Sequence, residues 1–565
     1  GSTLIRPAYW LQDQRIDLAG ARTRVEATGS SAWQCHLAPD QPGNWRWRLL
    51  ADLHWRDQTL AHVGDWQECQ VAATGDDSLL PVRRSTDPRW WERSDGSWFY
   101  PVGINLRSPG DERQDELLEN AESERRSADW EHEGLAAYED WFDKMQAAEM
   151  NYARIWMCPW WCGLEWTREW NGFGGLGWYH QGNAARLDSI CRLASERGIY
   201  LQIELQNHGM TSPHIDGQWD LSPYNRANGG PAASAADFFS DPDCWEATRK
   251  RHRYVLARWG HLPHIMAWVL SSEMEFTGDW YAHAYHKGYH DPDAVSQPTM
   301  DWVTTNIAWL KEHDYWQRPV SVHFSHPWRA RPLWRQPELG FSNSNVYTGF
   351  QTEMNRLGGR KAGLASGFHY YLTKHFPPWE LGRPSMLGEW GGHWHETRPE
   401  KLQAELHTGL WMQAVLPFGG NVGFWWWLWV DATDRWDEYR AIARFRADDD
   451  PRGQDFKPVI PRPDSGRAWV YGMAGDSSFR LYAWIRGLDR DFDQEAIADA
   501  GACRLTSRHP NRRWRLERWN CTDGSLEASR ELTSDRLGNI DLPLGRLDPD
   551  AAYKLDLIDA PAPRP

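Results

Sequence analysis

The sequence contains no long hydrophobic run. No stretch of its 565 residues approaches the roughly 20 consecutive apolar residues that a membrane-spanning helix requires. No charged and then apolar leader opens the chain either, and this leaves its localisation open. We therefore expect a protein without a membrane span.

Positive charge is scarce relative to negative charge. The chain carries 62 Lys and Arg residues against 78 Asp and Glu residues, which gives a formal net charge of −16. Proteins bind phosphate backbones and anionic membranes through clustered Lys and Arg side chains, which release counterions. A nucleic-acid partner is therefore not expected, and neither is binding to an anionic membrane surface.

Cysteine is sparse and lacks the spacing of metal ligands. The eight cysteines include no CxxC pair, and the two that lie nearest in sequence, Cys158 and Cys162, belong to a CPWWC segment. Because no further ligands stand at zinc-like spacing, we expect no metal site. Two cysteines in each terminal region leave two alternatives open, namely one disulfide in each region or buried free thiols.

Tryptophan, in contrast, is abundant, with 40 residues. An indole offers a rigid apolar plane and one N–H donor, which suits both the face of a sugar ring and a hydrophobic core. Core packing is the more general role, so position decides and number does not. The tryptophans that stand beside Asn, His and Glu at predicted strand ends are expected to bind sugar; they are Trp160, Trp161, Trp390, Trp394, Trp425 and Trp427.

Three regions of different pattern divide the chain. Residues 1–83 contain short alternating segments separated by turn residues, which predict an Ig-like β-sandwich. Residues 84–450 alternate apolar runs with amphipathic helical segments, the pattern of a parallel sheet or barrel. Residues 451–565 return to period-two segments and predict a second β-sandwich.

Eight strand-like runs occur in the central region. They are 100–105, 152–157, 200–206, 265–271, 319–324, 341–346, 385–389 and 420–427. The predicted fold class is therefore α/β, a (β/α)8 TIM barrel flanked by two β-sandwich domains. The charged segment 108–133 is an insertion after the first strand, expected to be a solvated loop, with a position over the functional site as the alternative.

Two glutamates stand at predicted strand ends. Glu273 follows the fourth strand and Glu389 follows the seventh, and in such barrels the carboxyl ends of the strands build the active site. A pair of carboxyl groups is the minimal apparatus for hydrolysing a glycosidic bond, because one protonates the leaving oxygen while the other attacks the sugar or activates water. Structural ion pairs would be the alternative explanation.

Several segments carry a resemblance to a known group of enzymes. They are GNWRW at 43–47, DGSWFYPVGIN at 95–105, NYARIW at 151–156, LGE at 387–389 and GFWWW at 423–427. With these segments the sequence resembles the clan A retaining glycoside hydrolases, in particular bacterial members with a small β-sandwich before the barrel and another after it. The resemblance extends over nearly the whole chain.

The resemblance implies roles for individual residues. Glu273 would be the general acid/base and Glu389 the nucleophile. Arg154, which ends the second strand, would bind the nucleophile and keep it ionised, with Glu204 as an alternative partner for the arginine. Glu273 should have a raised pKa, so that it begins the reaction protonated.

One position departs from the resemblance. Members of the clan usually carry Asn directly before the acid/base, in contact with the sugar 2-hydroxyl, whereas this chain has Ser272. A serine hydroxyl is shorter, so we expect a contact through water or an unusual group at the 2-position of the substrate. The departure also admits Glu275 as a rival acid.

Further polar side chains follow the third, fifth and sixth predicted strands, and they are expected to contact the sugar. They are Asn207, His208, His323, Asn345 and Tyr347. The resemblance places a tyrosine after the sixth strand near the nucleophile, and Tyr347 fits that position.

Together these features predict a retaining glycoside hydrolase that cleaves a β-linked oligo- or polysaccharide by double displacement, without a cofactor. The resemblance implies a bacterial, extracytoplasmic (secreted or periplasmic) setting. Two alternatives stay open. One is a catalytically inactive carbohydrate-binding or assembly protein on the same scaffold, which Ser272 favours. The other is a metal-dependent barrel hydrolase, for which His393 and His395 supply an HxH spacing.

Overall fold

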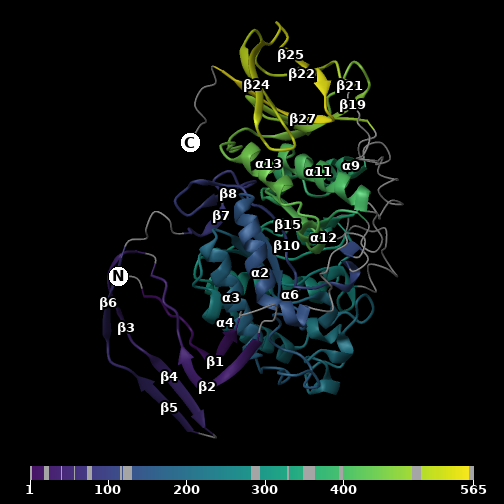
Figure 1. Ribbon diagram of the computed structural model, residues 1–565. Helices are drawn as coiled ribbons and strands as arrows, with labels where there is room; N and C mark the ends of the chain where they lie inside the picture. The colour runs from purple at the N-terminus through teal and green to yellow at the C-terminus, as the bar shows by residue number, and fades with distance from the viewer. Residues whose placement is uncertain are drawn as a thin grey trace.

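The protein has a central barrel, with N-terminal strands on one side of it and a C-terminal sheet at the far end (Figure 1). The computed structural model describes residues 3–17, 24–39, 41–55, 58–72, 79–114, 117–118, 130–280, 293–326, 330–347, 363–392, 399–486 and 498–558. All structural statements concern these residues.

Eight parallel strands form the barrel, in the order β14-β13-β12-β11-β10-β17-β16-β15. Their bounds are β10 Val102–Asn105, β11 Tyr152–Trp156, β12 Tyr200–Glu204, β13 Ile265–Val269, β14 Val320–Ser321, β15 Ser342–Val346, β16 Ser385–Trp390 and β17 Asn421–Phe424. A parallel bridge between Phe324 and Ser344 joins the two edge strands, so the sheet nearly closes on itself. The predicted TIM barrel is confirmed, with a strand at each of the eight predicted runs.

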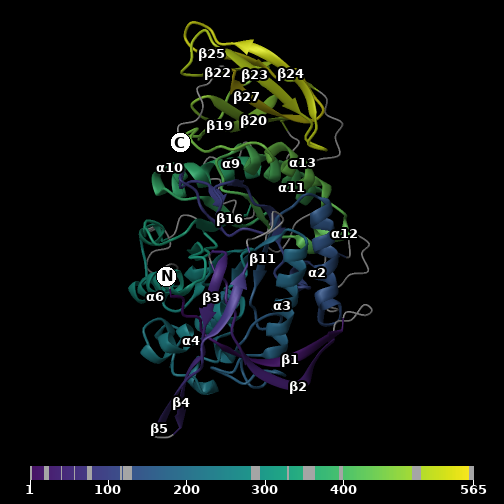
Figure 2. The same ribbon diagram turned by 90° about the vertical axis from the view of Figure 1, so that its left-hand side faces the viewer.

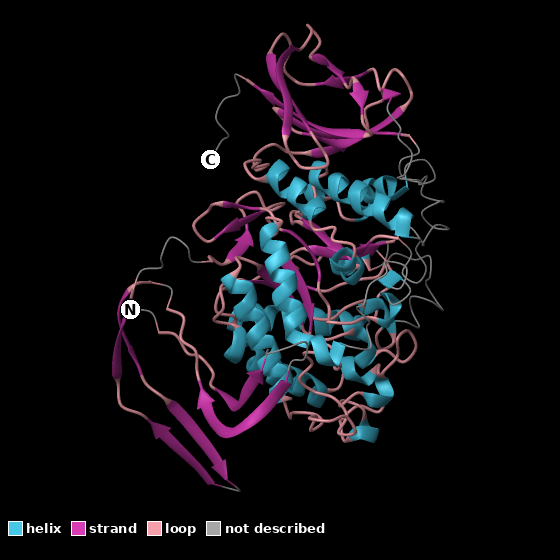
Figure 3. Cartoon of the chain, in the orientation of Figure 1, coloured by secondary structure: helices cyan, strands magenta, loops and turns pink. Residues whose placement is uncertain are grey.

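Helices surround the barrel (Figures 2 and 3). Their bounds are α2 Trp130–Ala147, α3 Gln181–Glu196, α4 Pro242–Trp259, α6 Gln297–His313, α7 Arg331–Trp334, α9 Gly363–Tyr370, α10 Pro378–Leu381, α11 Pro399–Val415, α12 Trp427–Ala432 and α13 Asp437–Arg446. The prediction that strand eight extends to Trp427 is wrong, because the chain turns after Phe424 and Trp427 begins α12. None of the described helices is long and apolar enough to cross a membrane.

A small antiparallel sheet closes the amino end of the barrel. It consists of β7 (Val82–Arg84), β8 (Trp91–Arg93) and β9 (Trp98–Phe99). Val82, Trp91 and Phe99 pack against interior barrel side chains such as Tyr152 and Met386, which lie near the beginnings of their strands. These apolar side chains fill the amino end of the barrel. The polar side chains of the barrel therefore line its carboxyl end, where a site can form.

The N-terminal region consists of three antiparallel strand pairs. They are β1 (Tyr9–Asp17) with β2 (Arg24–Gln34), β3 (Gly43–Trp47) with β6 (Gln67–Val71), and β4 (Leu50–Trp55) with β5 (Gln58–Val63). The first pair contacts α3, whereas large side chains such as Trp33 and Leu60 are 70% and 65% exposed. Two packed sheets are not seen among the described residues of this region, so the Ig-like sandwich stays a prediction.

The C-terminal region contains a six-stranded sheet in the order β18-β19-β20-β27-β23-β24. The bounds are β18 Lys457–Val459, β19 Ala468–Ala474, β20 Ser478–Ile485, β23 Arg513–Trp519, β24 Leu526–Thr533 and β27 Asp550–Leu557. The remaining strands pair as β21 (Ala498–Asp499) with β26 (Arg546–Leu547) and β22 (Ala502–Thr506) with β25 (Asn539–Pro543). Leu505 and Ile540 of β22 and β25 share a core with Leu481 and Leu555 of the large sheet, so a second layer covers one face of it.

The eight cysteines are free thiols, and all except Cys35 and Cys69 are buried. The alternative of one disulfide in each terminal region is therefore wrong, and the alternative of free thiols holds for the six buried residues. Burial raises the pKa of the Cys158 thiol to about 12, which keeps it uncharged near neutral pH.

The other face of the C-terminal sheet packs on the barrel helices, and a charged cluster lies in this interface. His407 of α11 contacts Glu438 of α13 through Nδ1 at 2.6 Å and Asp550 of β27 through Nε2 at 2.8 Å. The Tyr482 hydroxyl donates to the same Asp550 oxygen at 2.6 Å. Burial alone would lower the pKa of His407, but the two carboxylates outweigh it and raise this pKa to about 10.

We expect this cluster to make stability depend on pH. The pKa of His407 is about 10 in the folded protein and has an ordinary value of 6.5, so its contribution is complete below about pH 6.5 and is lost as the pH rises toward 10. Each pKa unit corresponds to ~1.4 kcal/mol, so the loss should reach a few kcal/mol. Urea unfolding between pH 6 and 10 would measure the effect. The His407→Gln variant should lack this slope, and equal slopes in the two proteins would contradict the assignment.

Candidate active site

Two carboxyl groups meet at the carboxyl end of the barrel. Glu389 is the penultimate residue of the strand β16, and Glu273 follows β13, directly before the short helix η7 (Met274–Phe276). The side chain of Glu389 is 6% exposed and that of Glu273 is 16% exposed. The structure thus brings together the two glutamates that the sequence predicts as the reactive pair.

Three donors hold Glu389. The Tyr347 hydroxyl donates to Oε2 at 2.8 Å, the amide of Asn345 donates to the same oxygen at 3.1 Å, and Arg154 donates to Oε1 at 3.4 Å. Hydrogen bonds and a nearby cation favour the ionised form of a carboxyl group. Tyr347 and Arg154 thus lie beside Glu389, as the sequence predicts.

Arg154 binds Glu204 more closely than it binds Glu389. Its Nε donates to Glu204 Oε2 at 2.8 Å, and its NH2 group contacts the same oxygen. Burial raises the pKa of Glu204 to about 7 although Arg154 acts in the opposite direction. Arg154 itself is 1% exposed. Both partners predicted for this arginine, Glu389 and Glu204, are thus present, and together they enclose its guanidinium.

His323 and Asn345 connect the two carboxyl groups. The Nδ1 atom of His323 accepts from Arg154 NH2 at 3.1 Å and from the backbone N–H of Glu273 at 3.3 Å. The ring proton must therefore lie on Nε2, which donates to the side-chain oxygen of Asn345. Burial, followed by the charge of Arg154, holds the pKa of His323 well below its ordinary value, which agrees with a neutral ring.

The orientation of the Asn345 amide follows from this tautomer. Because its oxygen accepts from His323, its nitrogen faces the two glutamates, with 3.1 Å to Glu273 Oε1 and 3.1 Å to Glu389 Oε2. One amide group thus contacts both carboxyl groups. His323 and Asn345 are 0% and 1% exposed, so the predicted sugar contacts of these two residues are wrong: they position the glutamates instead.

The close approach of His323 to β16 requires glycine at position 388. A Cβ atom there would overlap the imidazole ring and would lie 2.8 Å from the side-chain oxygen of Asn343. We expect Gly388→Ala to lower the free energy of unfolding by ~1–3 kcal/mol, the usual cost of overpacking a core. Gly64→Ala is a suitable control, because its Cβ would meet ordinary contacts of 3.5 Å or more. Urea unfolding compares the two variants, and equal losses would contradict the requirement.

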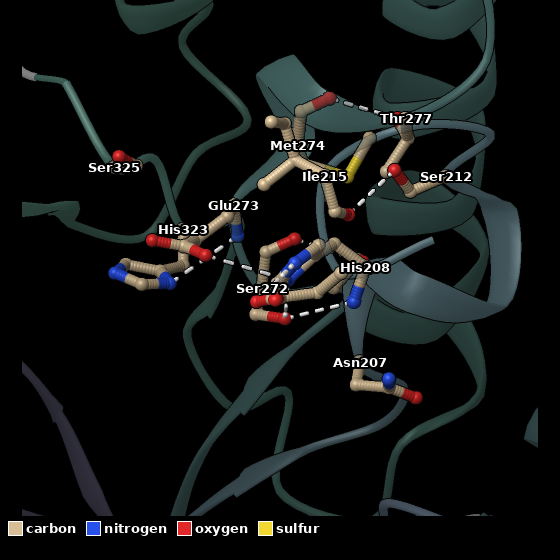
Figure 4. A network of polar contacts seen from close by, with 12 residues as sticks. Asn207, His208, Ser212, Ile215, Ser272, Glu273, Met274, Thr277, His323 and Ser325 are labelled. Atoms are coloured by element: carbon tan, nitrogen blue, oxygen red, sulfur yellow. Dashed lines mark hydrogen bonds and ion pairs between the residues drawn. The ribbon is translucent and has the colours of Figure 1, made fainter. Parts of the chain in front are cut away.

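Glu273 has the environment of a protonated acid. Its backbone adopts a left-handed conformation with φ of 34°, and its N–H is held by His323 (Figure 4). Burial raises the pKa of Glu273 well above its ordinary value, and the carboxyl groups of Glu389, Glu275 and Asp216 raise it further, whereas Arg113 lowers it. A carboxyl group in this setting can donate a proton near neutral pH.

Ser272 does not reach toward a ligand. It is 0% exposed, and its hydroxyl accepts from the backbone N–H of His208 at 2.9 Å and lies 3.1 Å from the ring Nδ1 (Figure 4). The predicted contact between Ser272 and the substrate is wrong, because the serine side chain is used to hold His208. Asn207, 4% exposed, donates to Gln218 at 2.9 Å.

The rival acid Glu275 is fixed by the neighbouring loop. Its carboxylate accepts from the backbone N–H groups of Ser325 at 3.1 Å and His326 at 2.8 Å, and it is 0% exposed. A carboxylate that is enclosed and holds two backbone donors is a structural anchor.

The tryptophans divide into core and site groups. Trp390 and Trp427 have no exposed surface and donate their indole N–H groups to the backbone oxygens of Val422 at 2.7 Å and Ser108 at 3.1 Å. Trp161 is 1% exposed and stacks on a neighbouring tyrosine ring. The predicted sugar contacts of these three are wrong because their indole planes are used in packing. Trp160 is half-buried, and Trp425 is 3% exposed; Trp394 lies outside the described residues.

Arg107 lies among the remaining indoles and was not predicted. Its guanidinium carbon is 5.4 Å from the ring centre of Trp160 and 5.3 Å from that of Trp425. It also lies within 5.8 Å of Trp156 and Trp427. A cation of the chain itself therefore occupies the space between these rings, through cation–π contacts. A local sequence pattern cannot predict this contact, because its residues come from the segments at or after strands one, two and eight, which are far apart in the sequence.

Arg113 and Asp216 are two further site residues that the sequence reading missed. Arg113 belongs to η1 (Glu112–Gln114) of the insertion after β10, and its NH2 group lies 2.8 Å from Asp216 Oδ2 in the segment after β12. Gln114 anchors this part of the insertion, because its side-chain oxygen accepts from Leu428 N–H at 3.1 Å. The described part of the insertion thus lies over the site, as the alternative interpretation of the charged segment states.

One group of side chains could in principle hold a metal ion. Among the described residues, ligand atoms of His208, Asp216 and Glu273 lie within 4.8 Å of one another. The Arg113 guanidinium contacts the same Asp216 oxygen that faces His208, and its positive charge opposes binding of a cation there. The predicted HxH pair, His393 and His395, lies outside the described residues.

Comparisons with known proteins give the fold. No protein-family model matches the sequence, and a comparison with curated proteins gives no match either. A solved structure of a candidate glycoside hydrolase from Bacteroides vulgatus is 11% identical, with a TM-score of 0.50 over 95% of this chain and 93% of its own. A glycoside hydrolase family 5 protein from Bacteroides vulgatus is also 11% identical, with a TM-score of 0.50 over 84% of this chain and 93% of its own. The chain therefore has the barrel fold that these glycoside hydrolases share.

Proposed function

We propose that the protein is a retaining glycoside hydrolase that cleaves a β-linked glycan by double displacement. The observation that carries the proposal is the single amide nitrogen of Asn345, which lies 3.1 Å from an oxygen of each glutamate. These two oxygens can be no more than about 6 Å apart. Retaining enzymes place their carboxyl groups about 5–5.5 Å apart and inverting enzymes about 6.5–9.5 Å apart, so this spacing favours retention.

The environments of the two carboxyl groups support different roles. Glu389, held by Tyr347, Asn345 and Arg154, would attack the anomeric carbon and form a glycosyl ester. Glu273, with its raised pKa, would protonate the leaving oxygen and then remove a proton from the water that hydrolyses the ester. Two carboxyl groups in different environments supply both functions of this mechanism, which requires no cofactor.

The substrate class is part of the same proposal. Trp160, half-buried near the site, offers indole surface suited to the apolar face of a pyranose ring, whereas Trp425 is nearly enclosed. His208 lies beside Glu273, with its Nδ1 3.5 Å from Glu273 Oε2 (Figure 4). We propose an oligo- or polysaccharide substrate and an extracytoplasmic location for the protein.

The first experiment is a screen of aryl β-glycosides and β-linked polysaccharides with proton NMR of the earliest product. A hydrolysed β-glycoside should release the β-anomer first, before mutarotation. First release of the α-anomer would exclude retention. Glycan binding without any product would instead favour the inactive binding protein, and loss of hydrolysis with a chelator would favour the metal-dependent alternative.

A further inference from the structure

His208 is enclosed between two carboxyl groups. Its Nδ1 lies 3.5 Å from Glu273 Oε2, and its Nε2 lies 3.5 Å from Asp216 Oδ2. The ring is 5% exposed, and its Nε2 has no other hydrogen-bond partner among the described residues. Each carboxyl group thus faces a different nitrogen of the same imidazole.

The Ser272 hydroxyl limits where the ring proton of His208 can lie. The oxygen already accepts from the His208 backbone N–H at 2.9 Å, and within the described part of the chain its own hydrogen has no acceptor other than Nδ1, at 3.1 Å. If the hydroxyl donates to Nδ1, the proton of the neutral ring lies on Nε2, where it faces the negatively charged carboxylate of Asp216 at 3.5 Å. The two neighbours of the ring therefore favour the same tautomer.

The backbone and Arg113 fix the position of Asp216. Asp216 adopts φ of 45°, a conformation that Asp tolerates better than most residues. Gly209 O accepts from Ser212 N–H at 3.2 Å and from Gln218 N–H at 2.9 Å. Residues on either side of Asp216 are therefore hydrogen-bonded to the same carbonyl oxygen. The contact with His208, followed by the charge of Arg113, lowers the pKa of Asp216, which therefore stays ionised.

We propose that Asp216 is a positioning residue that keeps the proton of the His208 ring on Nε2 and so leaves Nδ1 without a proton where it faces Glu273. An N–H group at Nδ1 would donate to the Glu273 carboxylate and stabilise its ionised form. Without that donor, Glu273 retains its proton and can act as the acid. This role rests on the proposed function of Glu273.

The first test reads the tautomer directly and needs no substrate. Long-range proton–nitrogen NMR of the full-length protein labelled with ¹⁵N-histidine distinguishes the two tautomers, and a His208→Gln spectrum identifies the His208 signals. We expect the Nε2–H form in the wild type and a partial change to the Nδ1–H form in Asp216→Asn, whose neutral amide is a weaker acceptor. An Nδ1–H form or a doubly protonated ring in the wild type would overturn the proposal, as would an unchanged tautomer in Asp216→Asn.

The second test measures kcat/KM against pH. In Asp216→Asn the alkaline limb, which reports Glu273, should move about 0.5–1 pH unit lower, while kcat on the acid side stays within a few-fold. The lost charge of Asp216 by itself lowers the pKa of Glu273, so a lower limb supports the proposal only together with the tautomer change of the first test. The other groups that face Glu273 are the same in both proteins: Arg113, His208, Glu275, His323, Tyr347 and Glu389. A limb that stays in place or moves higher would overturn the proposal.

Asp220→Asn is the matched control. It removes the same charge from the same segment, and Asp220 is exposed and is not among the groups that act on Glu273. Both tautomer and pH profile should be unchanged in this variant. If the wild type hydrolysed no glycoside, the proposed function would fail, while the NMR result would still decide the role of Asp216.

Discussion

Glu389→Gly is expected to reduce kcat by ~10⁴–10⁶-fold, the scale on which loss of a nucleophile acts in other hydrolases. The variant loses the atom that forms the covalent bond, whereas the neighbouring donors Tyr347 and Asn345 are left in place. Added azide should restore turnover of aryl glycosides, because a small anion fits the space of the missing side chain and meets the same donors. Since azide replaces the first displacement and no second one follows, the product should be the α-glycosyl azide. Mass spectrometry and NMR of the product would identify it.

Glu389→Gln is the control for this experiment. Its amide removes the nucleophile but fills the space that azide needs, so activity should be lost without rescue. A folded Glu389→Gly variant that gives no glycosyl azide would count against Glu389 as the nucleophile. A β-configured azide would indicate that the residue acts as acid/base instead.

Glu273→Gln should give a loss that depends on the leaving group. Glycosides with dinitrophenolate leaving groups need no proton and should retain most of their rate of glycosylation. Alkyl glycosides and polysaccharides should lose ~10²–10⁴-fold, the usual contribution of general acid catalysis. Because the acid must be protonated, wild-type activity should fall as the pH rises through the raised pKa of Glu273, and this alkaline limb should be absent from the variant.

A comparison with Glu275→Gln separates the two candidate acids. Glu275 holds the backbone of the segment after β14, so its substitution should reduce stability but leave the dependence on the leaving group unchanged. A uniform loss in Glu273→Gln for all leaving groups would exclude Glu273 as the proton donor. A loss in Glu275→Gln that depends on the leaving group would assign the role to Glu275.

The barrel and the two glutamates could be predicted because each depends on local sequence. Strand-like apolar runs separated by helical segments define the parallel barrel, and residues such as Glu389 and Glu273, at or shortly after the end of a strand, must lie at the carboxyl end of the barrel. The strand ends were less well predicted. The run 420–427 appeared as one strand, but aromatic side chains suit both a strand and a buried helix, and the chain turns after Phe424.

Side-chain roles at the site could not be predicted, because they depend on contacts between distant segments. An indole that packs in a core has the same sequence signature as one that binds sugar, so Trp390 and Trp427 were assigned to the wrong group. Ser272 was expected to face the substrate because its position was known but its partner was not. The ion pair of Arg113 and Asp216 joins residues 103 positions apart, which no local pattern indicates.

The placement of both glutamates on the Asn345 amide has a consequence for the timing of proton transfer in the proposed reaction. When Glu389 becomes an ester, it loses the negative charge that raises the pKa of Glu273, while the Asn345 amide still donates to Glu273. The loss of this charge favours the ionised form of Glu273 at the step at which it must accept a proton from water. The covalent state of one glutamate would thus reset the other from donor to acceptor within a single turnover, without movement of the backbone.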